Sequence, residues 1–564
     1  MEKKHLFFGV ACILLAFLVI IKDGSSSSPK GDDNGQISST VASLQPGRNI
    51  FAETANLQFR SNDGEKFVLE NDLIIAKISQ VGGGIDSIAL KHYRSSLCDE
   101  SPWLFDAYDR IQDALSLHLE MGGNLFDLRQ VHFQPVSYDG HHLILRGSLP
   151  NGIDVEREYT LTRGERGGDA YPIAHCVRLV NGTGRPLQGK YLHITLGSLP
   201  PTDGDMAGSH LNFIHYNGKR ACFIPLRKFA SSGGFFGMGK RSERHSIDGE
   251  GVFIWSAIKN QFFAAILTPK IPIHAFQASP LSLEKAQNGE QERGIEGTVK
   301  LPVGIMESGQ SVSLPMEYYV GPKEYMRLEQ LGQRQDLVMQ FGWFGWVSKL
   351  LLLSMKGIHS FLPNWGLAIV LLTICIKLLL WPLNSIQARS TRAMAKLQEP
   401  LKKIQEKYGN NRKKLQQETL RLFRENGVNP AAGCLPIFIQ LPIFIGLYSM
   451  LQAASELRFA SFLWIRDLSV ADTVARCYGF PVNPLPFAMC IAMFLQMRMT
   501  PQATQNKAQK RIFQCMPIML LFFCYRFPSG LVLYWTAQNF LSLWQQCIFN
   551  RHLLREEKCE GGNG

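Results

Sequence analysis

Five apolar runs after residue 364 limit the possible folds of this chain more than any other feature. They are Trp365–Leu383, Ala431–Leu451, Leu485–Met499, Phe513–Phe527 and Leu531–Phe549, and none contains Asp or Glu. About 20 apolar residues suffice to cross the hydrocarbon of a bilayer, and only helices or closed barrels satisfy the backbone there. The runs therefore predict an α-helical membrane bundle, in which the shorter runs cross a thinned bilayer or are covered by neighbouring helices.

A sixth apolar run opens the chain. Leu6–Ile21 follows Lys3 and Lys4, and the small-residue cleavage site of a secretory signal peptide does not follow it. We expect residues 1–23 to be an uncleaved transmembrane anchor, with a cleaved signal peptide as the alternative. Residues 24–49 are rich in Ser, Gly and Asp and are expected to be a flexible linker.

The charges between the runs assign the loops to the two sides of the membrane. Residues 384–429 carry eleven Lys or Arg against four Glu, residues 454–483 are neutral overall, and residues 500–512 carry three basic residues and no acid. Basic loops of membrane proteins face the cytoplasm. Six crossings with both termini in the cytoplasm place every loop on the expected side. We prefer this interpretation of the 384–429 charges to direct binding of DNA or RNA.

The membrane core is expected over residues 363–550, with a cytoplasmic helical hairpin at 384–429 and a cytoplasmic tail at 551–564. Two charged helices, 385–408 and 412–426, are separated by Gly409-Asn410-Asn411, which is a turn sequence. A hairpin that is merely solvated and fixes the topology is the simplest interpretation of this loop.

Residues 336–362 are apolar enough to suggest a further crossing, but their polar residues fall on one side of a helix. At 100° per residue, Ser348, Lys349, Lys356, His359 and Ser360 share an arc of about 120°. A seventh crossing would also invert the side of every later loop. We therefore expect an amphipathic helix that lies along the outer membrane surface.

Residues 50–335 have a different character. Short apolar stretches with strand-like alternation, such as Leu73–Ile78, His142–Leu145 and Val252–Ile258, are broken by Gly, Asn and Pro. They predict a large antiparallel β-sandwich, outside the cytoplasmic membrane on the topology above. A sugar-binding or sugar-active protein anchored to the membrane is the alternative function. No paired-carboxylate or metal-ligand spacing supports it, so we expect no enzyme, no metal site and no cofactor.

Lys377 is the most informative polar residue in the apolar runs. It lies about 10 Å of helix from Asn384, and a central Lys costs roughly 2.5–3.5 kcal/mol on insertion scales. One interpretation is that the Lys377 stem snorkels to the cytoplasmic headgroups. We prefer a cation that lines a hydrated groove inside the bundle. The other candidate groove residues are Thr373, Gln440, Gln496, Gln538, Asn539, Ser542 and Trp535.

Four segments resemble a known family. They are Asn429-Pro430-Ala431-Ala432-Gly433-Cys434-Leu435-Pro436, Gln440-Leu441-Pro442-Ile443-Phe444, Phe527-Pro528-Ser529-Gly530-Leu531-Val532-Leu533-Tyr534-Trp535 and Tyr319-Val320-Gly321-Pro322-Lys323. The chain resembles the YidC membrane-protein insertases over its whole length, and in particular the Gram-negative type with a large periplasmic domain. The family pattern has Arg at the position of Lys377 and usually Gly at that of Ala432. Lys keeps the charge of the Arg but loses its planar fork.

The resemblance implies a membrane-protein insertase and folding chaperone of the cell inner membrane, which works alone or with the Sec translocon. It implies a five-helix insertase core plus the anchor helix, and a galactose-mutarotase-like periplasmic sandwich. The groove would pass hydrophilic segments of nascent membrane proteins and release their helices into the membrane lipid. The hairpin would help to receive clients with the ribosome and the signal recognition particle pathway, through Arg389, Arg392, Lys402, Lys403, Lys413 and Lys414.

We predict that Gly409, at the tip of the hairpin, is cytoplasmic, because the loop around it is the most basic one. A cysteine introduced there (Gly409→Cys) should stay unmodified when intact cells are treated with a membrane-impermeant thiol reagent, and should react after the cells are lysed. Labelling of intact cells at this position would contradict the six-crossing topology.

Overall fold

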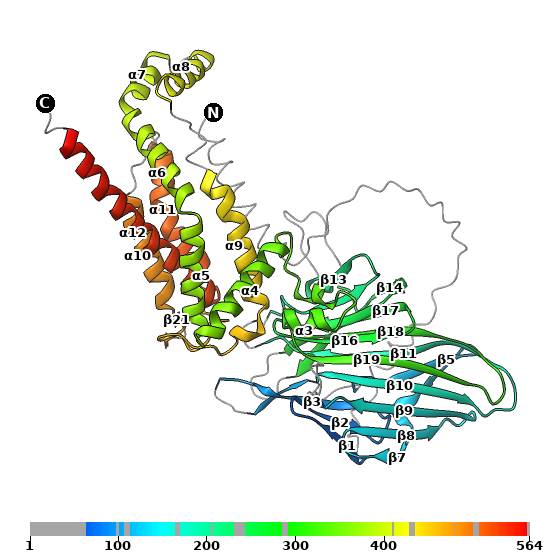
Figure 1. The fold of residues 1–564 in the computed structure, drawn as a ribbon. Coiled ribbons are helices and arrows are strands. Elements are labelled where there is room, and N and C mark those ends of the chain that lie inside the picture. The colour runs from blue at the N-terminus through cyan, green and yellow to red at the C-terminus, as the bar shows by residue number, and fades with distance from the viewer. Residues whose placement is uncertain are drawn as a thin grey trace. The chain divides into compact units, whose positions relative to one another are not determined.

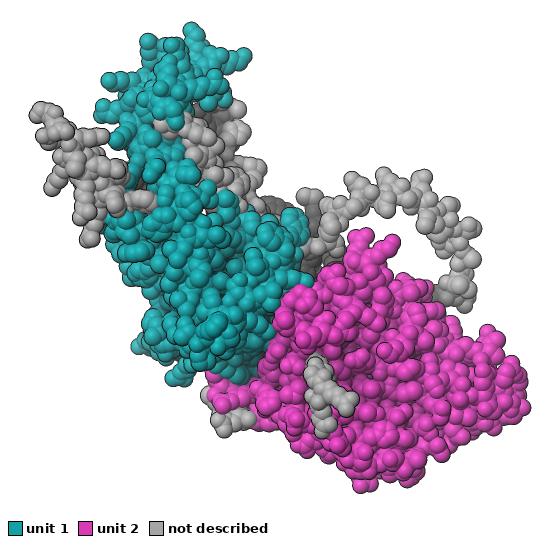
Figure 2. All heavy atoms as spheres, viewed as in Figure 1, with its two compact units in different colours: residues 1–24, 340–564 teal, residues 25–339 magenta. Residues whose placement is uncertain are grey.

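Figure 1 shows a chain with a β-rich part and a helical part. The computed structural model describes residues 64–97, 101–105, 113–163, 170–202, 205, 207–230, 243–284, 291–408, 411–427, 435–478, 480–499 and 507–560. The described residues form two compact units, which divide between Met339 and Gln340 (Figure 2). We call them the sandwich domain and the helical domain. The predicted anchor 1–23 and linker 24–49 lie outside the described residues.

The sandwich domain is built on two large antiparallel sheets. The nine-stranded sheet has the order β13 (Ala221–Pro225), β12 (Asn212–Tyr216), β15 (Trp255–Lys259), β16 (Phe263–Pro269), β19 (Ser311–Pro322), β10 (Pro172–Asn181), β9 (Ile153–Leu161), β8 (His142–Ser148) and β7 (Gln134–Tyr138). The six-stranded sheet has the order β14 (Ile247–Phe253), β17 (Ile273–Glu284), β18 (Gln291–Met306), β11 (Leu187–Leu199), β5 (Leu117–Met121) and β6 (Asn124–Asp127). A smaller sheet contains β1 (Lys66–Glu70), β2 (Ile74–Ser79), β3 (Ile85–Arg94) and β4 (Pro102–Phe105), and the short helix α3 (Tyr325–Gln330) follows β19.

The two large sheets pack face to face and bury a core between them. Along β9, every second residue is buried, so one face of the strand points inward. Across the interface, the rings of Phe213 on β12 and Phe276 on β17 lie 5.0 Å apart. The Tyr318 hydroxyl on β19 donates to the Leu196 carbonyl on β11 at 2.6 Å. The β-sandwich predicted for residues 50–335 is confirmed where the structure describes them.

The helical domain contains α4 to α12 and one small hairpin. The elements are α4 (Gly345–Phe361), α5 (Trp365–Leu379), α6 (Trp381–Lys396), α7 (Gln398–Tyr408), α8 (Arg412–Glu425), α9 (Leu435–Ala453), β20 (Ala475–Cys477), β21 (Phe480–Val482), α10 (Pro484–Met499), α11 (Lys507–Cys524) and α12 (Ser529–Glu560). Asn364 caps α5, where its side chain accepts a hydrogen bond from the Leu367 amide at 3.0 Å. α5 and α6 meet at an angle of 60°, with Pro382 in the first turn of α6.

Among the described residues, no single helix is both long and apolar enough to cross a membrane by itself. The bent pair α5 and α6 reaches that length and apolarity together. The six-crossing topology stays a prediction.

The helix expected over 336–362 is present as α4, but the face that α4 buries differs from the predicted one. A 3-10 turn (Gln335–Met339) precedes α4. Ser348, predicted on the polar face, is fully buried, and its hydroxyl donates to the Gly446 carbonyl on α9 at 2.9 Å. This part of the prediction is wrong because α4 packs closely on α9, where a Cβ at Gly446 would lie 2.9 Å from Val347. The exposed face of α4 carries large apolar side chains: Trp346, Leu350, Leu353 and Phe361.

The loop between α9 and α10 holds the start of α12. The Ser529 amide donates to the Val470 carbonyl at 2.7 Å, and the Ser529 hydroxyl donates to the Asp467 carbonyl at 2.9 Å. These bonds satisfy groups that the first turn of a helix leaves unpaired. Only residues 525–528 separate α11 from α12, and Ser529 and Gly530 already belong to the first turn of α12.

Gly297 on β18 tests the packing of the two large sheets. A Cβ at Gly297 would lie 2.5 Å from the Phe213 ring and 3.3 Å from Ile258. We expect Gly297→Ala to lower the unfolding free energy of the sandwich domain by about 1–3 kcal/mol, which is the usual cost of overpacking a core. Urea unfolding of the purified chain, followed by the β-sheet circular dichroism signal, measures this change.

The control for this prediction is a second substitution that removes the obstructing ring. Because Phe213→Leu opens space for the new methyl, the double variant with Gly297→Ala should lose less stability than the sum of the two single variants. Wild-type stability of Gly297→Ala would show that the sheets are not packed as described.

Candidate functional site

Lys377 lies inside the helical domain. It belongs to the last turn of α5, and only 7% of it is exposed. Its Nζ donates to the Ser542 hydroxyl on α12 at 2.8 Å, and that hydroxyl donates to the carbonyl of Gln538 one turn earlier at 2.8 Å. The ammonium is therefore held between α5 and α12.

Polar side chains continue along one face of α12. Tyr534, Gln538, Ser542 and Gln545 fall within an arc of about 80° at 100° per residue. Near one end of this face, Gln440 on α9 donates from Nε2 to the Tyr534 hydroxyl at 2.7 Å. We call the whole set the polar seam: Lys377, Gln440, Tyr534, Gln538, Asn539, Ser542 and Gln545.

Several amide groups of the polar seam are unpaired. Gln538 Oε1, Asn539 Nδ2 and Gln545 Nε2 have no hydrogen-bond partner within the described part of the chain. Asn539 and Gln545 are nevertheless buried. A buried polar group without a partner costs about 1–3 kcal/mol. The described residues therefore leave these three amide atoms with a free-energy cost that a polar partner would remove.

The other predicted groove residues are less closely connected to Lys377. Thr373 is fully buried, and its hydroxyl donates to the Ile369 carbonyl of its own helix at 2.7 Å. Trp535 is half-buried, with its ring 5.0 Å from that of Phe444. Gln496 is half-buried on α10, and among the described hydrogen bonds none joins it to Lys377.

Tyr534 and Gln545 are members of the polar seam that the predicted set lacks. Their spacing from Gln538 and Ser542, four residues and three residues, is the helical pattern that could have found them. Tyr534 lies within a recognised motif, but its sequence does not reveal that Gln440 would be its partner.

The charged hairpin is a second candidate site. The helix expected over 385–408 is interrupted at Leu397, which separates α6 from α7. The second helix begins at Arg412 as predicted, where the Asn411 side chain accepts a hydrogen bond from the Lys414 amide at 3.2 Å. Of the six basic residues proposed for recruitment, Arg389, Lys402, Lys403, Lys413 and Lys414 are exposed and Arg392 is half-buried.

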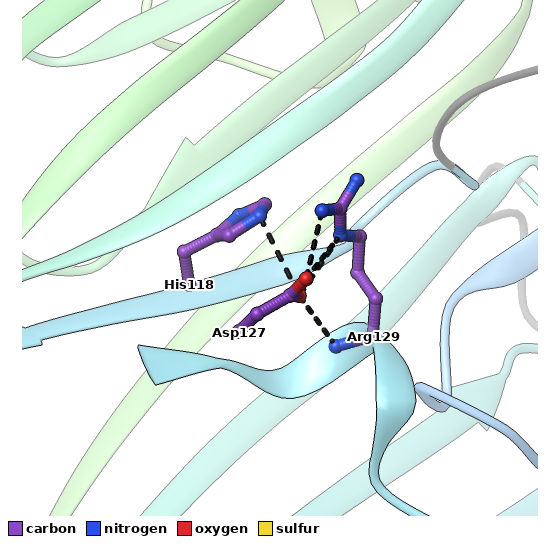
Figure 3. A network of polar contacts seen from close by, with 3 residues as sticks. All are labelled: His118, Asp127 and Arg129. Atoms are coloured by element: carbon purple, nitrogen blue, oxygen red, sulfur yellow. Dashed lines mark hydrogen bonds and ion pairs between the residues drawn. The ribbon is translucent and has the colours of Figure 1, made fainter. Parts of the chain in front are cut away.

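The sandwich domain carries a polar network on its six-stranded sheet (Figure 3). Asp127 lies between Arg129, whose Nη2 is 2.7 Å away, and His118, whose Nε2 is 3.6 Å away. Burial, followed by the positive charge of Arg129, lowers the pKa of His118 to about 4. Within the described ranges, no group of three His, Cys, Asp or Glu side chains is placed to hold a metal ion.

Two family models match the chain. The model described as the YidC periplasmic domain matches residues 66–353, and the model described as the 60Kd inner membrane protein matches residues 357–556.

Three relatives, each named Membrane protein insertase YidC, align over most of the chain. The relative from Syntrophus aciditrophicus is 30% identical over 503 residues, which is 86% of this chain and 85% of the relative. The relative from Nitrosospira multiformis is 31% identical over 524 residues, which is 91% and 86%. The relative from Haemophilus influenzae is 28% identical over 570 residues, which is 98% of each.

Two solved structures show weaker likeness. A crystal structure described as an active YidC insertase with the first transmembrane domain resolved covers 86% of this chain and 92% of its own, at 18% identity and a TM-score of 0.34. A putative aldose 1-epimerase from Escherichia coli K12 covers 46% of this chain and 99% of its own, at 12% identity and a TM-score of 0.31. Both scores are below 0.5, so the fold rests on the strand pairing described above.

The buried His118 predicts how acid affects the sandwich domain. In the unfolded chain this histidine binds a proton near its ordinary pKa of 6.5, whereas in the folded chain it does so only near pH 4. The unfolding free energy should therefore fall as the pH drops from about 6.5 through 4, by up to about 1.4 kcal/mol per pH unit for this group. Urea unfolding of the purified chain across this pH range measures the slope.

His118→Gln should make that slope shallower, because one proton is removed from the linkage. His92→Gln is the matched control, since His92 is an exposed histidine of the same domain. An unchanged slope in His118→Gln would mean that His118 is protonated equally well in the folded and unfolded chain.

Proposed function

Because the chain belongs to the YidC family of membrane protein insertases, we propose that its polar seam receives the hydrophilic segments of inserting client proteins. The chain is an inner membrane protein, and its sandwich domain is the periplasmic domain. One observation supports the proposal above all. The Lys377 ammonium is enclosed 2.8 Å from Ser542, and none of the apolar runs contains an acid that would neutralise it.

The physical task of an insertase explains why such a seam is useful. A hydrophilic segment that crosses about 30 Å of hydrocarbon leaves its backbone groups without partners. Amides and hydroxyls along α12 give those groups partners for part of the way. The apolar helix of the client then leaves sideways into the lipid, where its surface is stable. We propose no covalent step, so the site residues bind and guide the client.

Lys377 adds an electrostatic preference to this path. An ammonium has three N–H donors, and Ser542 is its one hydrogen-bond partner among the described residues. The remaining donors are available to a carboxylate of the client. Lys acts as a point charge without the bidentate geometry of Arg, so we propose a general attraction for acidic segments.

The remaining roles concern topology and partners. We propose that both termini and the hairpin of α7 and α8 face the cytoplasm, where exposed basic residues such as Lys402, Lys403 and Lys413 meet clients arriving with the ribosome or the signal recognition particle. We propose that the protein acts alone or beside the Sec translocon. The relatives are insertases, and they do not favour the alternative of a sugar-binding or sugar-active protein.

Removal of the Lys377 charge tests the proposal. Two charges about 4 Å apart attract each other by about 1 kcal/mol even at the dielectric constant of bulk water. Lys377→Ala should therefore reduce the insertion yield of a client with acidic translocated residues. The reduction should be roughly five times larger than that of a matched client in which neutral residues replace the acidic ones. The measurement is the insertion yield of the matched clients in cells that depend on this protein alone.

Two variants complete this experiment. Lys377→Arg keeps the charge and should insert both clients like the wild type. Lys349→Ala removes a lysine of α4, outside the polar seam, and should affect both clients equally. If Lys377→Ala inserts both clients as well as the wild type, Lys377 merely snorkels and the proposed attraction is wrong.

A further inference from the structure

A second enclosed group of charges lies in the sandwich domain, at one end of the nine-stranded sheet. Lys259 ends β15 and pairs with Ala264 on β16, which pairs in turn with Gly321 on β19. Lys323 follows two residues after Gly321. By this register the two lysines lie at the same end of β15 and β19, which are separated by β16, and on the same face of the sheet. The Lys323 amide donates to the Phe262 carbonyl at 2.7 Å, which fixes this end of β19.

Both lysines are buried without a counter-ion in contact. Lys259 is 3% exposed and Lys323 is 2% exposed. Among the described residues, neither ammonium has a hydrogen bond or an ion pair, and Lys259 Nζ lies 5.7 Å from the centre of the Phe223 ring. Burial lowers the pKa of Lys259 to about 7, against the opposing charge of Asp205. Burial and the charge of Lys259 lower the pKa of Lys323.

The neighbouring carboxylate is already used by the backbone. Asp205 accepts hydrogen bonds from the Ser209 amide at 2.8 Å and the His210 amide at 2.7 Å, and also from the Ser209 hydroxyl. Other buried polar residues complete the surroundings: Thr202, Asn212, Asn260 and Gln261. Asn212 pairs with Lys259 across the strands.

With both lysines protonated and Asp205 ionised, the group carries one net positive charge, and this uncompensated charge opposes protonation of the lysines. A bound anion would supply the missing negative charge and favour the protonated lysines. Buried charges in proteins are paired or bound to ligands. We propose that Lys259 and Lys323 form a binding site for one carboxylate in the sandwich domain. A single negative charge makes the group neutral, whereas a phosphate dianion would reverse its sign. The carboxylate belongs either to a small free acid or to a polypeptide.

Acetate is the probe for this site. The purified full-length chain in lipid nanodiscs is heated in sodium acetate and in sodium chloride at equal ionic strength. A ligand that binds only the folded chain raises its unfolding temperature. Acetate should raise the unfolding temperature of the sandwich domain by a few degrees above the value in chloride, and the shift should saturate with concentration.

Substitution of the lysines distinguishes the site from a general salt effect. Lys259→Met and Lys323→Met should abolish the acetate shift. In chloride both variants should unfold at a higher temperature than the wild type, because folding no longer buries a lysine without a counter-ion. Lys270→Met, at an exposed lysine just past the opposite end of β16, should keep the full shift. Lys259→Gln and Lys323→Gln provide the same test if a methionine variant does not fold.

The source of the carboxylate is tested with two short peptides that differ by one Glu or Gln. A larger shift with the Glu peptide than with acetate indicates a polypeptide, and a shift with acetate alone indicates a small acid. The proposal is overturned if acetate and chloride act alike on the wild type, or if the methionine or glutamine variants respond to acetate as the wild type does.

Discussion

The hydrogen bond between Lys377 and Ser542 joins two helices of a membrane protein through a positive charge. A charge in such a place needs polar partners, because little water reaches it. Ser542 can accept this bond since its own proton is given to the Gln538 carbonyl at 2.8 Å. Polar residues on the same face of α12 extend the environment that this charge requires. The geometry of the proposed client path thus follows from the need to accommodate one lysine.

Polar groups of the helical domain are paired in some places and unpaired in others. In the loop between α9 and α10, Asp472 accepts a hydrogen bond from the Leu485 amide at 2.6 Å. Ser529 is bound to this loop at both its amide and its hydroxyl, whereas Ser455 Oγ has no partner among the described residues. The groups of the polar seam are partly unpaired, at Gln538, Asn539 and Gln545. Unpaired buried groups are rare in folded proteins. All three lie within about two turns of α12, where we propose that a client binds.

Local sequence patterns predict the features of this molecule that depend on residues close together in the sequence. Burial of one sheet face gives the strands an alternation of period two, so the sandwich can be predicted from the sequence. The order of its strands cannot, because β10 pairs with β19, which lies more than a hundred residues away along the chain. Lys377 is predictable because a lysine in an apolar run is costly. Ser348 and Tyr534 are not, since their roles depend on Gly446 and Gln440 of a helix that packs against them.

The most direct test of the account asks what touches the polar seam during insertion. A photoreactive amino acid at position 538 or 545 is compared with one at position 540, where Phe540 is exposed on another face of α12. With a client stalled during insertion, positions 538 and 545 should crosslink to the hydrophilic segment beside the client helix, and position 540 should not. Crosslinks to that segment from position 540 alone, or from all three positions equally, would contradict the proposed path.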